Sequence, residues 1–182
     1  MSTNEANVDI RKNIEETVKS FLLAYEDGRE QNDTSIINRD LTPECTRQLL
    51  PVSLCKALGL PETALISNDQ YETLYANDLS VGGVYNTVSK HLIIDAEAKR
   101  AAVTSKSDFK YKDSDVIAVE FSWTFYFNED GRKIDKVIEF ADGDAVKRMA
   151  AKAQELQASR GTNGVNGDSG KLKQDVDFFE TG

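Results

Sequence analysis

An α+β fold is predicted by three observations. Helical periodicity occupies the first part of the 182-residue chain, strand periodicity begins at Val84, and the last strand pattern runs directly into a helix pattern at Asp142. A run of helices followed by a run of strands is typical of folds whose helices cover one face of an antiparallel sheet. We therefore expect one antiparallel sheet with helices against it.

The first helix is predicted by an apolar stripe. The side chains that recur at the spacing of one helix face are Ile14, Val18, Phe21, Leu22 and Tyr25. Gly28 follows the stripe and is expected to end the helix, because glycine adopts the left-handed conformation of a C-cap without strain.

Shorter helices are expected before the strands. Thr42 followed by Pro43 predicts a helix start, and this helix should end near Pro51. Residues 52–59 predict one or two further turns, and SNDQ at 67–70 is a capping box. The helix that it opens carries Tyr71, Leu74 and Tyr75 on one side.

Strand patterns cover residues 84–95, 100–112, 116–127 and 132–141, separated by polar turn segments. In the first strand, Val88, Leu92 and Ile94 should share a face. In the third, every odd position from Ile117 to Phe127 is apolar, whereas the even positions include Glu120 and Tyr126. This alternation predicts one dry face and one face with polar groups.

The end of the chain differs from the rest in composition. Residues 158–182 are rich in Gly, Asn and Ser and lack periodicity, so we expect one domain over residues 1–157 and a flexible tail over 158–182. The tail ends in DVDFFETG, which suits either a short docking peptide or a terminus without a role.

Charge and composition argue against several function classes. The net charge of −9 and a pI of about 4.7 make a nucleic-acid partner unfavourable. No apolar run is long enough for a signal or a membrane span, so we expect a cytoplasmic protein without a membrane partner, with Cys45 and Cys55 as buried thiols. The single histidine and the lack of a phosphate or dinucleotide fingerprint predict no metal and no cofactor.

The joint between the last strand and the last helix carries a resemblance. Asp142 is expected to cap the helix, and Asp144 suits the positive end of its dipole. The order of elements and the VIEFAD joint resemble the NTF2-like superfamily, in particular its SnoaL-like and ketosteroid-isomerase-like branches, over residues 8–157.

This resemblance implies a bent sheet wrapped around the first helix, which forms a cone with a pocket at its wide end. It also implies a homodimer that packs through the sheet. Relatives of this kind include isomerases, cyclases and dehydratases on polyketide- or steroid-like compounds as well as non-catalytic carriers, and the fold alone does not choose among them. The dehydratase branch uses a histidine pair, which the single His91 excludes.

Four residues are candidates for acid–base catalysis, which needs a carboxyl group of raised pKa in a dry pocket. Asp40 precedes the expected second helix, where relatives carry a polar residue at the pocket mouth. Glu120 and Glu139 would face each other across the sheet if the hairpin turn is centred on residues 129–130. If they are buried there, the two carboxyl groups would share a proton, and if they are exposed, both would be solvated. His91 is either a further base or a structural residue.

Aromatic residues are the candidates for ligand binding. Tyr25, Tyr71, Tyr75 and Tyr126 could donate hydroxyl groups, and Trp123 either belongs to the core or stacks on a ligand. Two functions follow. One is a small-molecule-binding protein that isomerises or cyclises a small hydrophobic ligand without a cofactor, and the other is a non-catalytic dimeric module that holds a protein partner.

Overall fold

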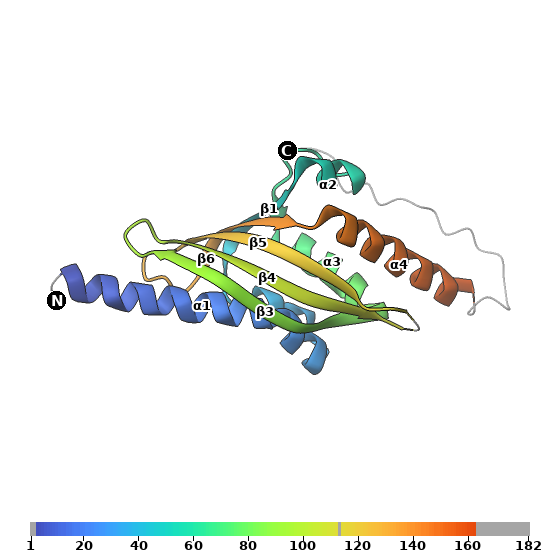
Figure 1. The fold of residues 1–182 in the computed structure, drawn as a ribbon, viewed down its shortest axis with the longest axis horizontal. Coiled ribbons are helices and arrows are strands. Elements are labelled where there is room, and N and C mark those ends of the chain that lie inside the picture. The colour runs from blue at the N-terminus through green and yellow to red at the C-terminus, as the bar shows by residue number, and fades with distance from the viewer. Residues whose placement is uncertain (1–2, 113, 163–182) are drawn as a thin grey trace.

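The computed structural model describes residues 3–112 and 114–162, and it confirms the predicted α+β class (Figure 1). The elements are α1 (Thr3–Gln31), the 3-10 helix η1 (Thr34–Asn38), β1 (Leu41–Leu50), α2 (Val52–Ala57), β2 (Ile66–Ser67), α3 (Asn68–Val81), β3 (Gly82–Asp95), β4 (Arg100–Tyr111), β5 (Ile117–Phe127), β6 (Ile134–Ala141) and α4 (Gly143–Thr162). Among these elements, no helix is long and apolar enough to cross a membrane.

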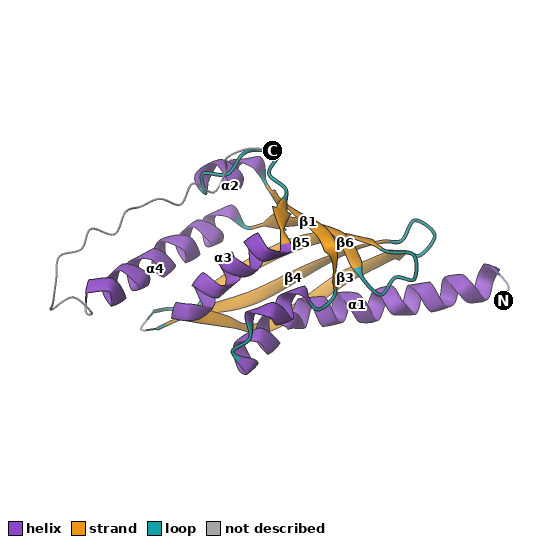
Figure 2. Ribbon diagram, turned by 180° about the vertical axis from the view of Figure 1, so that it is seen from behind, coloured by secondary structure: helices purple, strands orange, loops and turns teal. Residues whose placement is uncertain are grey.

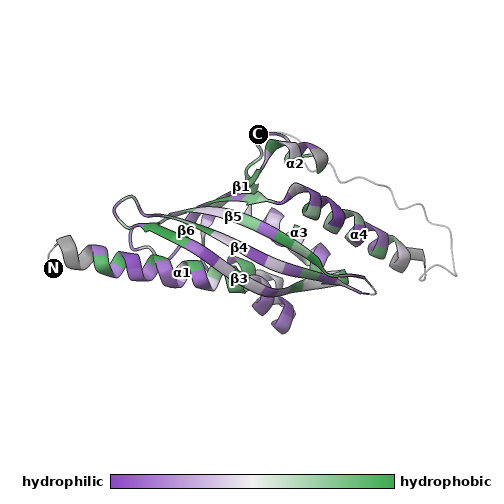
Figure 3. Ribbon diagram, viewed as in Figure 1, coloured by the Kyte–Doolittle hydropathy of each residue, from purple (hydrophilic) through white to green (hydrophobic). Residues whose placement is uncertain are grey.

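The strands form one sheet in the order β2-β1-β6-β5-β4-β3. β1 runs parallel to β6, and the other neighbouring pairs are antiparallel. Figure 2 shows α1, α3 and α4 on the same side of the sheet. The two sides are called the inner face, which these helices cover, and the outer face. Apolar and mostly polar residues alternate along β5, as expected for a strand with one dry face (Figure 3).

Helix α1 supplies much of the core. Its predicted stripe is confirmed, because Ile14, Val18, Phe21 and Leu22 are buried against the inner face. The Phe21 ring makes edge contacts with Trp123 and Phe125, at centroid distances of 5.5 and 5.0 Å.

Gly28 does not end this helix, which continues to Gln31. A Cβ at Gly28 would lie 2.8 Å from the hydroxyl oxygen of Tyr75. That hydroxyl donates a hydrogen bond of 2.7 Å to the Tyr25 carbonyl. The glycine therefore allows α1 and α3 to approach each other, and the C-cap prediction was wrong.

The prediction of a helix that starts at Thr42 and Pro43 is also wrong, because this segment forms strand β1. Cys45, Arg47 and Leu49 alternate with more exposed neighbours along it, which is the periodicity of a strand. Hydrogen bonding to β6 on one side and β2 on the other outweighs the local helix-start signal. The turns predicted over residues 52–59 and the capping box at Ser67 are present, as α2 and the start of α3.

Strand β3 departs from simple alternation. Its pairing with β4 shifts between Tyr85 and Val88 and again between Lys90 and Ile93. Each irregularity contains a residue with positive φ, Asn86 and His91. Because a bulge moves later side chains to the opposite face, Val88 is 55% exposed instead of sharing the inner face with Leu92 and Ile94.

The joint between β6 and α4 forms as predicted. The Asp142 side chain accepts hydrogen bonds from the backbone N–H groups of Asp144 and Ala145, at 3.0 and 3.2 Å. Helix α4 continues past the expected end at Gln157 to Thr162. Of the expected tail, residues 163–182 lie outside the described residues.

Candidate functional site

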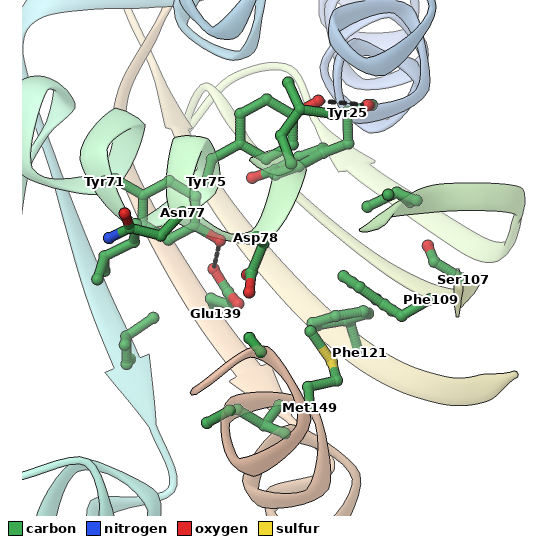
Figure 4. Close-up of a pocket in the computed structure, with 18 of the residues that line it drawn as sticks. Tyr25, Tyr71, Tyr75, Asn77, Asp78, Ser107, Phe109, Phe121, Glu139 and Met149 are labelled. Carbon is green, nitrogen blue, oxygen red and sulfur yellow. Dashed lines mark hydrogen bonds between the residues drawn. The ribbon is translucent and has the colours of Figure 1, made fainter. Parts of the chain in front are cut away.

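A cavity of about 380 Å³ lies between the inner face of the sheet and helices α1, α3 and α4 (Figure 4). Most of its lining is apolar. The aromatic lining residues are Tyr25, Tyr71, Tyr75, Phe109, Tyr111, Phe121 and Trp123. This volume falls in the range of about 300–1,000 Å³ that is usual for small-molecule sites.

One wall of the cavity carries a buried polar network. Arg47 Nη1 donates to the Tyr25 hydroxyl oxygen at 2.6 Å and to Glu139 Oε2 at 3.2 Å. The Tyr71 hydroxyl donates to the same Glu139 oxygen at 3.1 Å (Figure 4). The Arg47 guanidinium also stacks on the Tyr71 ring, with its central carbon 3.3 Å from the ring centroid. The network joins β1, β6, α1 and α3.

The fold explains why these side chains meet. β1 and β6 are parallel neighbours in which Leu49 pairs with Glu139 and Arg47 pairs with Val137. Arg47 and Glu139 both point to the inner face, so the two charges lie beside each other under the helices. Tyr71 reaches Glu139 from the first half of α3, which the capping box at Ser67 starts.

The carboxyl group of Glu139 has the environment of an acid–base group. Burial raises its pKa above the ordinary value, against the lowering effects of the Arg47 charge and the Tyr71 hydrogen bond. Both hydrogen bonds to Glu139 fall on Oε2, and within the described ranges no group bonds to Oε1. Since Glu139 lines the cavity, Oε1 is the oxygen that can meet a ligand.

Five of the predicted site residues come together in this cavity: Tyr25, Tyr71, Tyr75, Trp123 and Glu139. Of the aromatic residues of β5, some belong to the core and others line the cavity. Phe125 is fully buried in the core, whereas Trp123 lines the cavity and donates from its ring nitrogen to Ser105 Oγ at 2.8 Å.

Glu120 does not face Glu139, and the predicted register was wrong. Glu139 pairs with Trp123, because the hairpin loop is longer than a turn on 129–130 and the pairing shifts once more beside Tyr126. The change in register places Glu120 on the outer face, opposite Lys106. The two carboxyl groups therefore do not share a proton.

The other predicted residues also lie outside the cavity. Asp40 precedes strand β1 and not a helix, and its carboxylate lies 3.5 Å from Arg39 Nε. His91 is exposed on the outer face, where its Nδ1 lies 3.0 Å from Thr104 Oγ1. Tyr126 is on the outer face as well, and its ring contacts the cationic groups of Arg100 and Lys136.

Two polar residues of the site were missed from the sequence. Arg47 was placed in a helix, although its alternation with Cys45 and Leu49 is a strand signal. Asp78 lines the cavity from α3, and its spacing from Tyr71 and Tyr75 would have placed it on the same helix face.

Comparison with known proteins establishes the fold. No protein-family model matches the sequence, and no curated protein matches it. Among solved structures, BvnE pinacolase from Penicillium brevicompactum is similar over 87% of this chain and 97% of its own, with 22% identity and a TM-score of 0.64. PrhC from Penicillium brasilianum is similar over 85% of this chain and 97% of its own, with 15% identity and a TM-score of 0.66.

An NTF2-like protein of unknown function from Burkholderia pseudomallei is similar over 75% of this chain and 96% of its own. Its identity is 12% and its TM-score 0.53. This chain therefore has the NTF2-like fold, and the curved sheet around α1 confirms the predicted cone.

Proposed function

We propose that this protein is an acid–base enzyme that isomerises or cyclises a small apolar ring compound bearing a carbonyl or hydroxyl group. The observation that carries the proposal is the Glu139 carboxyl group, which is buried, hydrogen-bonded by Arg47 and Tyr71, and placed at the wall of an apolar cavity. A charged network beneath a ligand-sized cavity is unfavourable for stability alone and is typical of active sites.

In the proposed reaction Glu139 moves one proton. Its carboxylate removes a proton from a carbon next to the ligand's carbonyl group, and the electrons of that C–H bond pass to the carbonyl oxygen as an enolate. The Tyr25 hydroxyl, polarised by the hydrogen bond from Arg47, donates to this oxygen. Glu139 then returns the proton to another carbon of the conjugated system, so the ligand is isomerised and the enzyme is unchanged.

The chemistry uses only side chains of this chain, so the proposal includes no cofactor. The structural neighbour BvnE is named a pinacolase and another neighbour, from Bacillus subtilis, is named a putative isomerase, and these names support a catalytic function on this fold. We assign the chain to the SnoaL-like and ketosteroid-isomerase-like group on this basis.

The experiment uses a ketone whose isomerisation can be seen directly. 5-Androstene-3,17-dione gains ultraviolet absorbance when its double bond moves into conjugation with the carbonyl group. We expect wild-type protein to accelerate this change, and Glu139→Gln to lower kcat by about 10²–10⁴-fold, which is the usual contribution of an acid–base group. The matched control is Glu120→Gln, the same substitution on the outer face, which should keep full activity. Equal rates for Glu139→Gln and wild type would refute the assignment of Glu139.

We propose further that the protein is a homodimer which packs through the outer face. On that face three large apolar residues are exposed to solvent: Val88 is 55% exposed, Ile93 69% and Phe140 49%. Sedimentation should give twice the mass of 20.2 kDa, and Phe140→Glu should give the monomer mass. A cytoplasmic location belongs to the same proposal, supported by Cys45 and Cys55 as buried free thiols.

A further inference from the structure

The cavity holds a second carboxyl group, that of Asp78, which the proposed proton transfer does not use. Asp78 lies on α3 and lines the cavity together with Phe109 and Phe121 (Figure 4). Its side chain accepts one long hydrogen bond of 3.5 Å from the Tyr111 hydroxyl. Among the side chains that the structure describes, those of residues 7–56, 58–112 and 114–159, it forms no ion pair.

This position is unfavourable for a carboxylate in three ways. Asp78 lies in the last turn of α3, whose helix dipole is negative at that end. Its surroundings are apolar, and burial raises the pKa of its carboxyl group from 3.8 to about 6. Glu139 has a cation beside it, whereas no side chain within residues 7–56, 58–112 and 114–159 forms an ion pair with Asp78. A charged group in an unfavourable environment, without a partner that stabilises its charge, is typical of residues that serve a function.

The surrounding backbone holds the Asp78 partner in place. Tyr111 pairs with Gly82, where β3 begins. A Cβ at Gly82 would lie 2.5 Å from Tyr111 Cδ1 and 2.5 Å from the Lys110 carbonyl oxygen, so glycine is required for the ring to occupy this position. The ring thus packs against the end of α3, and its hydroxyl reaches Asp78.

The charge of the lining indicates what a ligand must supply. Two carboxyl groups, Asp78 and Glu139, face the cavity, and no Lys or Arg is among the described residues that line it. The charge of Glu139 is balanced by Arg47, so an anionic ligand would be repelled by Asp78, because like charges interact strongly away from water. A positive charge on the ligand would provide the counter-charge that Asp78 lacks.

We propose that Asp78 is a ligand-anchoring residue that binds a protonated amine, so that the substrate is an apolar ring compound with a basic nitrogen. This inference rests on the proposed function, because it names the substrate class of the same cavity. Tyr111 holds the Asp78 carboxylate in position, and Glu139 remains the group that moves the proton.

The test compares three probes that share one ring system. They are 9-(methylaminomethyl)anthracene, which is cationic, 9-anthracenemethanol, which is neutral, and 9-anthracenecarboxylate, which is anionic. Trp123 is the single tryptophan of the chain and lines the cavity, so energy transfer from it to a bound anthracene reports binding there. We expect the cationic probe to bind at least about tenfold more tightly than the neutral one, and the anionic probe to bind most weakly.

Variants assign this preference to Asp78. Asp78→Asn keeps the shape of the side chain, and it should abolish the gap between the cationic and neutral probes while neutral binding changes less than about twofold. Neutral binding also shows that the variant folds. Asp69→Asn removes the same charge from an exposed position on the same helix and should keep the gap.

The outcomes separate this inference from the proposed function. Equal affinity for the cationic and neutral probes, or an unchanged gap in Asp78→Asn, would overturn the role of Asp78 and leave Glu139 unaffected. Failure of all three probes to bind would overturn both proposals, because the cavity would then not be a small-molecule site.

Discussion

Replacing Arg47 by methionine removes the cation beside Glu139 while keeping a long, unbranched side chain. The two side chains are 3% and 8% exposed, and their charged atoms are 3.2 Å apart. Removing one partner of such a buried pair leaves an uncompensated charge, which costs about 3–5 kcal/mol of folding stability. That is a large part of the total of about 5–15 kcal/mol for a typical domain.

The loss of folding stability in Arg47→Met should depend on pH, because the carboxyl group of Glu139 titrates. Its folded-state pKa is raised by burial, so the folded form binds this proton more tightly than the unfolded form does. Stability linked to this proton is fully present below the unfolded pKa and is lost as the pH rises through the folded pKa. Arg47→Met also removes an opposing charge, so its loss of stability should be larger at about pH 8 than at about pH 5.

Urea unfolding, followed by the fluorescence of the buried Trp123, measures this loss directly. The double variant Arg47→Met with Glu139→Gln is the control, because it removes the charge that was left unpaired. It should recover a substantial part of the stability lost by Arg47→Met at about pH 8. A loss below about 1 kcal/mol, or the same loss at both pH values, would show that Arg47 does not balance a buried carboxylate.

Three further predictions test the geometry. Gly28→Ala should destabilise the protein, because the new Cβ would lie 2.8 Å from the Tyr75 hydroxyl oxygen, although helix propensity alone favours alanine by about 1 kcal/mol. A urea-unfolding free energy higher than that of wild type would contradict this. Asp78→Asn should be more stable than wild type at about pH 8, by up to about 3 kcal/mol. The reason is that the raised pKa of Asp78 makes the stability of the wild type fall as the pH rises through about 6. The same dependence of unfolding free energy on pH in both proteins would count against it. His91→Gln should leave ketone isomerisation unchanged, because His91 lies on the outer face, and a large drop in kcat would show that the site is misplaced.

The parts of the fold that the sequence predicts well are those set by periodicity and local caps. The stripe of α1, the alternation of β5 and the Asp142 cap all depend on residues close together in the chain. Segment β1 was misread because its strand state depends on β6, which lies far away in the sequence and supplies the hydrogen bonds.

The site was predictable only where it follows those local patterns. Tyr71 and Tyr75 lie on one face of a helix that is recognisable from its capping box. Glu139 is predicted from the sequence, whereas its partner Arg47 is not, because Arg47 lies on β1, where a local helix-start signal hides the strand. Glu120 is placed on the wrong face because one shift of register beside Tyr126 exchanges the two faces of the strand. Side-chain direction across a bulged hairpin depends on loop length and bulge position, which the alternation of residues does not encode.

A crystal structure of the protein soaked with 4-androstene-3,17-dione, the product of the test reaction, tests most directly whether the cavity beside Glu139 is the ligand site. We expect the steroid inside the cavity between α1, α3 and α4. Its conjugated carbonyl oxygen should lie within hydrogen-bonding distance of the Tyr25 hydroxyl, and Glu139 Oε1 should lie near the ring carbons. A steroid bound only on the outer face, or a cavity closed by its own side chains, would contradict it.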